Sequence, residues 1–272
     1  MSPSYPLNQS PFYRLASRQK LAKALWTSLK VLEQIANSGA AEYKQFPKKV
    51  GAKTRHIECP KGQLYKIASS LNRLLGRICV SDYVHSGVKG KSYHSNAKAH
   101  QTDVRVAKID VKQFFPSASY KFVYKCFLLT FQCSPDVASV LTKLSTINGH
   151  IPTGSPSSTI ISYYAYKPMF DEIDELAKSN GLTMSLCVDD MTFSGAKSSD
   201  SFLFGVYQIV RKHGLEGHKR YLYGAGKTKV VTGVAITPKG FRPQINVEKS
   251  FMRLYRPFTK LLTVSHSKRL RV

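Results

Sequence analysis

The chain has 272 residues, of which 42% are hydrophobic and 21% are charged. This length is typical of one large domain or two lobes, and the hydrophobic content excludes disorder throughout. The formal net charge of +25 destabilises a compact fold through self-repulsion unless a polyanion is near. The excess therefore indicates nucleic acid or an acidic membrane surface as a partner.

Charge is distributed unevenly along the chain. Residues 1–109 carry 19 Lys and Arg against 5 Asp and Glu, residues 110–204 carry 7 against 9, and residues 205–272 carry 15 against 2. Acidic residues are thus concentrated between two basic flanks. A binding module without chemistry has no need of this pattern. An enzyme that holds divalent metal on carboxylates and binds phosphates on either side does need it.

Targeting signals and cysteine usage bear on the cellular location of the protein. The first ten residues lack a basic stretch followed by an apolar one, so we expect no signal peptide. No apolar run approaches the roughly 20 residues that span a bilayer, so we expect no membrane partner. The five cysteines include no C-x-x-C pair, which favours a cytoplasmic location and inert thiols in the core over a structural zinc site. They are Cys59, Cys79, Cys126, Cys133 and Cys187.

Hydrophobic spacing and capping residues predict the elements of the first hundred residues. We expect helices over 17–36 and 63–80. Between them lies a basic segment of short strands or loop over 44–60. A loop over 86–100 is expected to enter a short helix.

A strand over 104–109 is then expected to end at Asp110. Alternating apolar residues predict a second strand over 183–188, with 191–194 returning as its hairpin partner and Asp189 and Asp190 at the tip. The other expected elements are helices over about 119–131, 135–146, 156–178, 199–213 and 248–262, a turn over 151–156 and a strand over 230–236.

Asp110, Asp189 and Asp190 are the candidate catalytic residues. An Asp-Asp pair by itself most often marks a turn. Here the pair lies between two apolar strands and Asp110 ends a third, so strand ends can aim all three carboxylates at one point. Hard oxygen ligands suit Mg²⁺. Two such ions about 3.5–4 Å apart activate an attacking hydroxyl and stabilise a leaving oxygen in phosphoryl transfer.

Several segments resemble a known family. Residues 110–117 (DVKQFFPS), 151–158 (IPTGSPSS) and 187–190 (CVDD) resemble motifs A, B and C of reverse transcriptases. Residues 95–100 (SNAKAH) and 231–234 (VTGV) are similar to marks of bacterial retron-type reverse transcriptases and their phage-defence relatives. A further similar segment is the finger stretch 55–60 (RHIECP). The resemblance covers about residues 42–240, and the order of the motifs makes it specific although each is weak alone.

The resemblance implies an α/β (α+β) right-hand polymerase. Its palm is an antiparallel sheet backed by helices. The implied parts are an N-terminal helical extension (1–40), fingers (41–105), a palm (106–240) with finger helices inserted at about 119–150, and a short, reduced thumb made of a basic C-terminal helix (241–272).

The resemblance also implies roles for single residues. Asp110, Asp189 and the Val111 carbonyl are expected to bind metal, with Asp190 as the second carboxylate of the pair. Phe115 is expected to pack under the incoming sugar and exclude a 2′-hydroxyl. The implied nucleotide contacts are Lys53 and Arg55 at the triphosphate, Gly154 near the nucleotide, and a lysine of motif D, for which Lys219, Lys227 and Lys229 are the candidates. The implied nucleic-acid contacts are Lys89, Lys91, Asn96 and His100.

The basic tail adds a further candidate nucleic-acid surface. Arg253, Arg256 and Lys260 recur at three- and four-residue spacing, so they share one face of the expected C-terminal helix. We expect this face to bind the backbone of a duplex or folded RNA. The alternative is a solvated helix.

Several of these residues can instead have purely structural roles. Phe114 and Phe115 can be core residues, Lys53 and Arg55 can be solvated, and His100 can be a structural histidine. Two further segments are expected to be structural: Tyr163, Tyr164 and Tyr166 as helix packing, and residues 224–228 as a hairpin turn. Three positions depart from the family motifs, Thr153, Cys187 and Val188, which leaves nucleotide choice and template handling open.

The function implied by the resemblance is RNA-directed DNA synthesis by two Mg²⁺ ions, for which Mn²⁺ can substitute. The implied template is a dedicated noncoding RNA, the implied setting is antiphage defence, and the implied partners are the RNA/DNA product and dNTPs. An effector protein and an oligomer are compatible with the family. Two alternatives remain: a template-independent or protein-primed nucleotidyltransferase on the same palm, and a catalytically idle RNA-binding scaffold for a toxin or effector.

Overall fold

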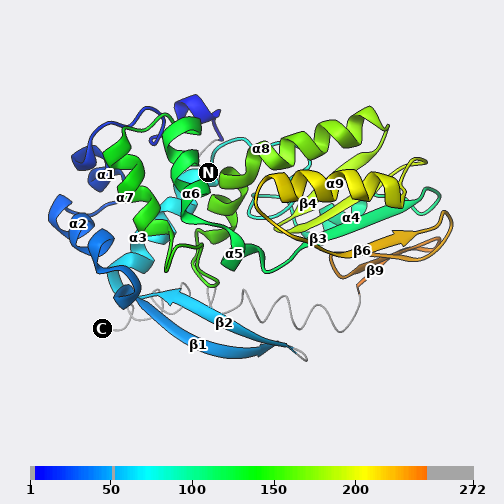
Figure 1. Ribbon diagram of the computed structural model, residues 1–272, viewed down its shortest axis with the longest axis horizontal. Coiled ribbons are helices and arrows are strands. Elements are labelled where there is room, and N and C mark those ends of the chain that lie inside the picture. The colour runs from blue at the N-terminus through cyan, green and yellow to red at the C-terminus, as the bar shows by residue number, and fades with distance from the viewer. Residues whose placement is uncertain (1–3, 51–52, 244–272) are drawn as a thin grey trace, which may run out of the picture.

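The structure is a computed structural model that describes residues 4–50 and 53–243. The fold is α+β: helices gather at one end, and the four-stranded and three-stranded antiparallel sheets lie at the other end with two long helices (Figure 1). Within the described ranges no helix combines the length and apolarity needed to cross a bilayer. The helix expected over 248–262, with Arg253, Arg256 and Lys260, lies outside the described residues.

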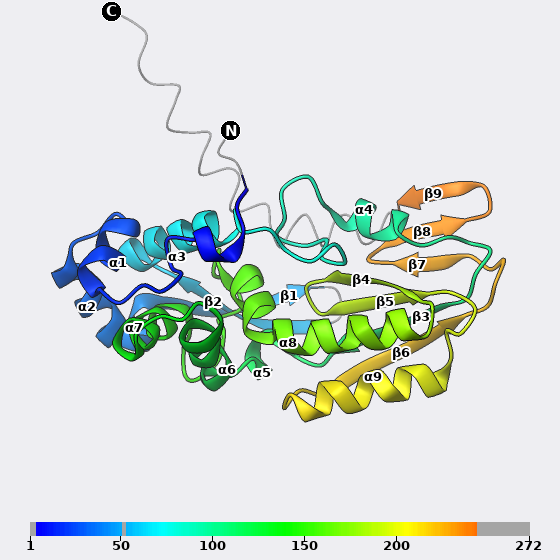
Figure 2. The ribbon, with the colours of Figure 1, turned by 90° about the horizontal axis from the view of Figure 1, so that it is seen from above.

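A four-stranded antiparallel sheet forms the centre of the end that contains the sheets, in the order β4-β5-β3-β6. Two long helices, α8 (Ser158–Ser179) and α9 (Asp200–Lys212), lie along one face of this sheet, and the opposite face is turned away from them (Figure 2). The strands are β3 (Val106–Val111), β4 (Thr183–Cys187), β5 (Asp190–Ser194) and β6 (Gly217–Tyr223).

Two smaller sheets accompany the central one. One is a hairpin of β1 (Tyr43–Val50) and β2 (Lys53–Pro60). The other is a three-stranded sheet of β7 (Lys229–Val231), β8 (Val234–Thr237) and β9 (Gly240–Pro243). Helix α4 (Tyr93–Lys98) packs on β8 through Ala97. Both α4 and the three-stranded sheet lie on the side of the central sheet that is opposite to α8 and α9 (Figure 2).

The remaining elements form the helical end and its links to the sheet. They are η1 (Leu7–Gln9), α1 (Arg18–Ala24), α2 (Leu29–Ser38), η2 (Gly39–Glu42), α3 (Gly62–Leu75), α5 (Phe114–Ser117), α6 (Tyr120–Lys125), the π-helical turn η3 (Cys126–Thr130) and α7 (Pro135–Ser145).

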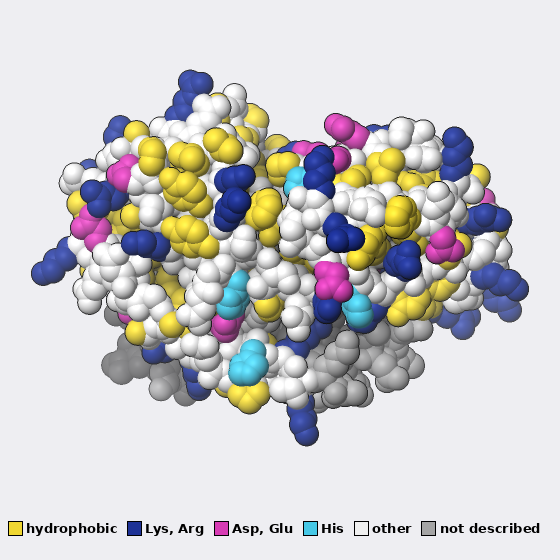
Figure 3. Space-filling view, in the orientation of Figure 1, with side chains coloured by type: hydrophobic (Ala, Val, Ile, Leu, Met, Phe, Trp, Pro, Cys, Tyr) yellow, Lys and Arg dark blue, Asp and Glu magenta, His cyan; other side chains and the backbone are white. Residues whose placement is uncertain are grey.

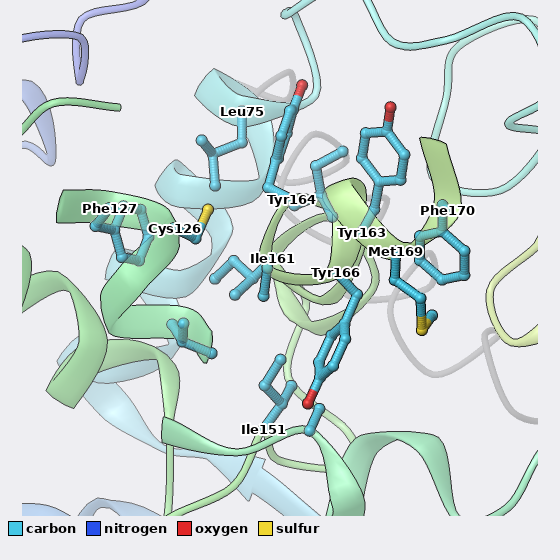
Figure 4. Packing of buried hydrophobic residues seen from close by; sticks show 14 of the residues in the cluster. Leu75, Cys126, Phe127, Ile151, Ile161, Tyr163, Tyr164, Tyr166, Met169 and Phe170 are labelled. Carbon is cyan, nitrogen blue, oxygen red and sulfur yellow. The ribbon is translucent and has the colours of Figure 1, made fainter. Parts of the chain in front are cut away.

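The N-terminal half of α8 forms the centre of the core. Tyr163, Tyr164 and Tyr166 are buried there, in a cluster with Met169 and Phe170 (Figure 4). Each ring contacts another ring at 4.9 to 6.4 Å between centroids. This burial confirms helix packing as the role of the tyrosine run and excludes a stacking platform for bases at these three positions.

The helix expected over 17–36 is two helices. α1 ends at Ala24 and α2 begins at Leu29. Trp26 between them adopts a φ of +56°, and the Ser28 hydroxyl accepts a hydrogen bond from the Val31 amide as the N-cap of α2. The leucine spacing continues across the break, so periodicity alone could not reveal it.

Other differences concern the C-terminal part of the described chain. The strand expected over 230–236 is a hairpin, because Thr232 and Gly233 form a turn with φ of +45° and +81°. Residues 224–228 connect strands of two different sheets, so they are not a hairpin turn. Strand β6 was missed because its side chains are nearly all exposed and show no alternation.

The cysteine prediction also needs correction. Cys126, Cys133 and Cys187 are buried as expected, but Cys79 is exposed and Cys59 is partly exposed. Burial raises the pKa of the Cys187 thiol to about 12, and the neighbouring carboxylates of Asp190 and Asp189 add to the effect. This thiol therefore stays protonated at neutral pH.

Candidate active site

Three carboxylates meet at one end of the central sheet. Asp110 near the end of β3 lies directly opposite Asp190, the first residue of β5, in the antiparallel register. Asp189 precedes it in the two-residue turn that joins β4 to β5, and the Val111 amide donates to the Asp189 carbonyl at 3.2 Å. Since directly opposite residues share a face of a sheet, Asp110 and Asp190 point to the same side. Ile109, which precedes Asp110 in β3 and points to the opposite face, is fully buried.

The turn that carries Asp189 is held in an unusual conformation. Val188 has a φ of +63°, a region that favours glycine and is costly for a β-branched residue. Two hydrogen bonds from the preceding loop stabilise it: the Val188 amide donates to Ser86 Oγ at 2.8 Å, and the His85 amide donates to the Leu186 carbonyl at 2.8 Å. The loop after Tyr83 is therefore part of the framework of the site.

The electrostatics of the carboxylates are unbalanced. Burial, followed by repulsion from Asp110 and Asp190, holds the pKa of Asp189 well above its usual range. Two lysines face the other carboxylates: Lys108 Nζ lies 3.1 Å from Asp190 Oδ2, and Lys219 Nζ lies 3.7 Å from Asp110 Oδ2. Burial and repulsion thus disfavour the charged form of Asp189, and a bound cation would offset both effects.

The donor set fits a hard divalent cation in its chemistry, because carboxylate oxygens are the ligands that Mg²⁺ prefers. As the side chains stand, however, the described part of the chain contains no group of three or more His, Cys, Asp and Glu placed to hold a metal ion. One oxygen of Asp190 is taken by Lys108. Asp110 and Asp189 are left as the pair that approach each other, and a hydrogen bond between them contributes to the raised pKa of Asp189.

Of the three lysines considered for motif D, Lys219 is the one that reaches the carboxylates. Strand β6 has a bulge at this point, since Lys108 pairs with Tyr221 while Asp110 pairs with His218. Lys219 lies in the bulge with a φ of +50°. Bulges of this kind redirect side chains near active sites. Lys219 could not be singled out from the sequence, because no sequence pattern reveals the bulge.

The expectation that Lys229 binds nucleotide is at odds with the structure. Its side chain is fully buried, and Nζ donates to the carbonyls of Gln101 and Thr102. Burial lowers its pKa. Lys227 is exposed in the link between β6 and β7. Lys229 thus ties β7 to the segment that holds Gln101 and Thr102.

Asn96 and His100 are interior residues as well, which corrects their expected contact with nucleic acid. His100 is 1% exposed, and its two ring nitrogens bond to the hydroxyls of Ser194 and Ser185 at 2.8 and 2.7 Å. Asn96 donates to Thr232 Oγ1 at 3.3 Å. The two family-like segments around these residues therefore tie α4 to the central sheet and to the β7–β8 turn. The structural alternative for His100 is confirmed, with serine hydroxyls as its partners.

Phe115 and Phe114 differ in exposure. Phe114 is buried against Tyr166 and Phe170, with ring centroids at 5.6 and 6.2 Å. Phe115 is half-buried and follows the end of β3, so part of its ring is open to a bound molecule. Of the two rings, Phe115 is the more exposed.

The β1–β2 hairpin approaches the loop that resembles motif B. A Cβ on Gly154, whose φ is +135°, would lie 3.0 Å from Ile57 Cγ2 and 3.2 Å from Cys59 Sγ. Glycine is thus required for this close approach. Arg55 in the same hairpin is exposed, and Lys53 lies at the start of β2.

Glu58 is a site residue that the sequence did not single out. It is 7% exposed in β2, and its carboxylate accepts from His150 Nε2 at 3.0 Å and from the Thr153 amide at 3.1 Å. The available signal was an acidic residue in an otherwise basic strand. Glu58 fixes the hairpin that carries Arg55 to the loop that carries Gly154.

Two basic residues lie in the loop that supports the Val188 turn. Lys89 and Lys91 follow Ser86, which holds the Val188 turn, and Lys91 Nζ donates to the Asp82 carbonyl at 2.6 Å. On the face seen in Figure 3, Lys and Arg side chains are spread widely, with Asp and Glu side chains at several places among them.

These features define a carboxylate centre on an antiparallel sheet, framed by basic residues, as in enzymes that act on phosphate esters with divalent cations. The chain is similar to curated retron reverse transcriptases. It is 32% identical over 220 residues to the Retron Se72 reverse transcriptase of Salmonella heidelberg (strain 579083-10), a match that covers 79% of this chain and 58% of the relative.

The chain is also similar to two further retron reverse transcriptases. Identity is 29% over 266 residues to the Retron Mx162 reverse transcriptase of Myxococcus xanthus, with 83% of this chain and 54% of the relative covered. Identity is 28% over 175 residues to the Retron Ec86 reverse transcriptase of Escherichia coli, with 61% and 53% covered. No family model matches the chain. The resemblance to retron-type reverse transcriptases, which are RNA-directed DNA polymerases, is confirmed, although the chain spans only somewhat more than half the length of these relatives.

Proposed function

We propose that the chain is an RNA-directed DNA polymerase whose chemistry takes place at Asp110, Asp189 and Asp190. The observation that carries the proposal is the meeting of these carboxylates at one end of a sheet, in a chain similar to retron reverse transcriptases. The raised pKa of Asp189 supports it, because an unbalanced cluster of carboxylates favours binding of cations.

Asp110, Asp189 and the Val111 carbonyl would hold two Mg²⁺ ions, or Mn²⁺ in their place. The ions would supply Lewis-acid activation of the primer hydroxyl and stabilisation of the leaving phosphate. Lys219 orients Asp110 through their 3.7 Å ion pair, and it can donate a proton from Nζ to the departing pyrophosphate.

The other residues bind and select the nucleotide. Arg55 and Lys53 on the β1–β2 hairpin neutralise the triphosphate, and Arg55 is suited to bidentate phosphate contacts. The half-buried Phe115 ring excludes a 2′-hydroxyl, and Gly154 lets its loop lie against β2, which holds the hairpin beside the nucleotide. Lys89, Lys91 and the basic tail with Arg253, Arg256 and Lys260 bind the phosphate backbone.

We further propose, from the resemblance of the sequence motifs to retron-type reverse transcriptases, that the template is a dedicated noncoding RNA and that the protein acts in antiphage defence. The residue boundaries given above for the fingers, palm and thumb are also part of this proposal. Sequencing the products made by the purified chain, with and without an RNA template, tests it. We expect DNA complementary to the added RNA. If the same products form without the RNA template, synthesis is template-independent. If no product forms with the template, the result favours an RNA-binding scaffold.

A further inference from the structure

Lys108 is a nearly buried cation on the face of the sheet that carries the carboxylates. It precedes Asp110 by two residues in β3, so both side chains point to the same side. Its side chain is 12% exposed, and lysines are rarely so buried without partners. Nζ lies 3.1 Å from Asp190 Oδ2 and donates to the Val230 carbonyl in β7 at 3.2 Å.

The three carboxylates are therefore compensated unequally. Asp190 has Lys108 at 3.1 Å, and Asp110 has the more exposed Lys219 at 3.7 Å. Within the described residues Asp189 forms no ion pair with a lysine or arginine within 4.0 Å. Lys108 thus gives one member of the Asp189-Asp190 pair a partner inside the protein and leaves the other available.

The same ammonium joins two sheets. Val230 lies in β7, the strand of the three-stranded sheet that faces the central sheet (Figure 2). The bond from Nζ to its carbonyl fixes Lys108 in reach of Asp190, and it links the sheet of β7–β9 to the end of β3. Displacement of β7 would move the cation that compensates Asp190.

We propose that Lys108 is a positioning residue that keeps Asp190 out of the cation-binding pair and so leaves Asp110 and Asp189 to bind divalent metal, an inference that rests on the proposed polymerase function. Without the ammonium, Asp190 becomes an uncompensated carboxylate beside two others. The metal-free protein then loses stability, and a divalent cation gains a further attraction.

The test is the melting temperature of the whole chain during Mg²⁺ titration, without nucleotide or RNA. In the Lys108→Met variant we expect a lower melting temperature than wild type without metal. We also expect a larger rise on adding Mg²⁺, with the midpoint of the titration at about threefold to tenfold lower concentration. Lys108→Arg keeps the charge and should stay close to wild type. Lys212→Met, which removes an exposed lysine paired with Glu172, is the matched control.

A purely structural role predicts a different result, namely a melting temperature lowered equally at all Mg²⁺ concentrations with an unchanged midpoint, and this outcome overturns the inference alone. A wild-type chain that does not respond to Mg²⁺ overturns the proposed metal chemistry and the inference together. If Lys108→Met does not fold, the double variant Lys108→Met/Asp190→Asn removes both buried charges. We expect it to fold and to keep a midpoint near wild type, and a shifted midpoint in this variant contradicts the role of Lys108.

Discussion

Glu58 and Thr153 exchange two hydrogen bonds across the gap between the β1–β2 hairpin and the loop over 151–156. The Glu58 amide donates to the Thr153 carbonyl at 2.8 Å, and the Thr153 amide donates to Glu58 Oε2 at 3.1 Å. The first bond uses only backbone and survives any side-chain change. The second depends on a buried carboxylate, which also accepts from His150. One of the two bonds between the hairpin and this loop therefore depends on a single side chain.

Glu58→Gln replaces an acceptor oxygen with an amide group that faces two donors. We expect the free energy of unfolding to fall by about 1–3 kcal/mol, because a buried donor loses its partner. If the proposed function is correct, KM for dNTP should rise more than kcat falls, since the hairpin carrying Arg55 loosens. Denaturant unfolding and steady-state incorporation measure the two effects. Glu33→Gln, which breaks only the exposed ion pair to Arg18, should change stability by less than about 1 kcal/mol. Equal effects of the two changes would contradict the positioning role of Glu58.

Phe115→Ala tests the proposed sugar gate. Removal of the half-buried ring should raise use of ribonucleotides relative to deoxyribonucleotides by on the order of tenfold, because a pocket of this kind discriminates a hydroxyl only by steric exclusion. The ratio of kcat/KM values for matched nucleotides is the measurement. Phe204→Ala, at an exposed position of α9, is the control. An unchanged ratio would contradict the proposed gate and leave Phe115 as a packing residue.

His100 predicts a pH dependence of stability. Burial lowers its pKa to about 3, whereas the unfolded chain has the ordinary value near 6.5. Between these values the unfolded state binds more protons, so the free energy of unfolding falls as pH falls. The slope from this group is about 1.4 kcal/mol per pH unit below pH 6.5. Unfolding at pH 7 and pH 5 should therefore differ by about 2 kcal/mol more in wild type than in His100→Gln.

The exposed His56 supplies the control for this comparison. His56→Gln should keep the wild-type difference between the two pH values, because this ring is exposed whereas the His100 ring is buried. A His100→Gln variant with the full wild-type difference would show that other groups cause the pH dependence.

The sequence predicts much of this arrangement and misses the rest for identifiable reasons. Strand alternation and the Asp-Asp pair suffice to bring Asp110 and Asp190 to one end of a sheet, as the register has it. Lys219 depends on a bulge, and the break at Trp26 depends on a backbone conformation. Neither feature alters the hydrophobic pattern.

Long-range pairing explains the remaining misses. His100 and its two serine partners are 85 and 94 residues apart in sequence, and Glu58 and His150 are 92 apart. Nothing local distinguishes such a buried polar residue from an exposed one. Lys108 is a further example, since a lysine two residues before an aspartate in a strand can equally be solvated.

The central claim is that the three carboxylates catalyse RNA-templated DNA synthesis. The most direct measurement is primer extension on an RNA template with dNTPs and Mg²⁺, for the wild-type chain and the Asp189→Ala/Asp190→Ala variant, with RNA affinity and melting temperature measured alongside. We predict complementary DNA from wild type, and for the variant a loss of at least about 1,000-fold in rate with RNA binding retained. Undiminished synthesis by the folded variant would contradict the account.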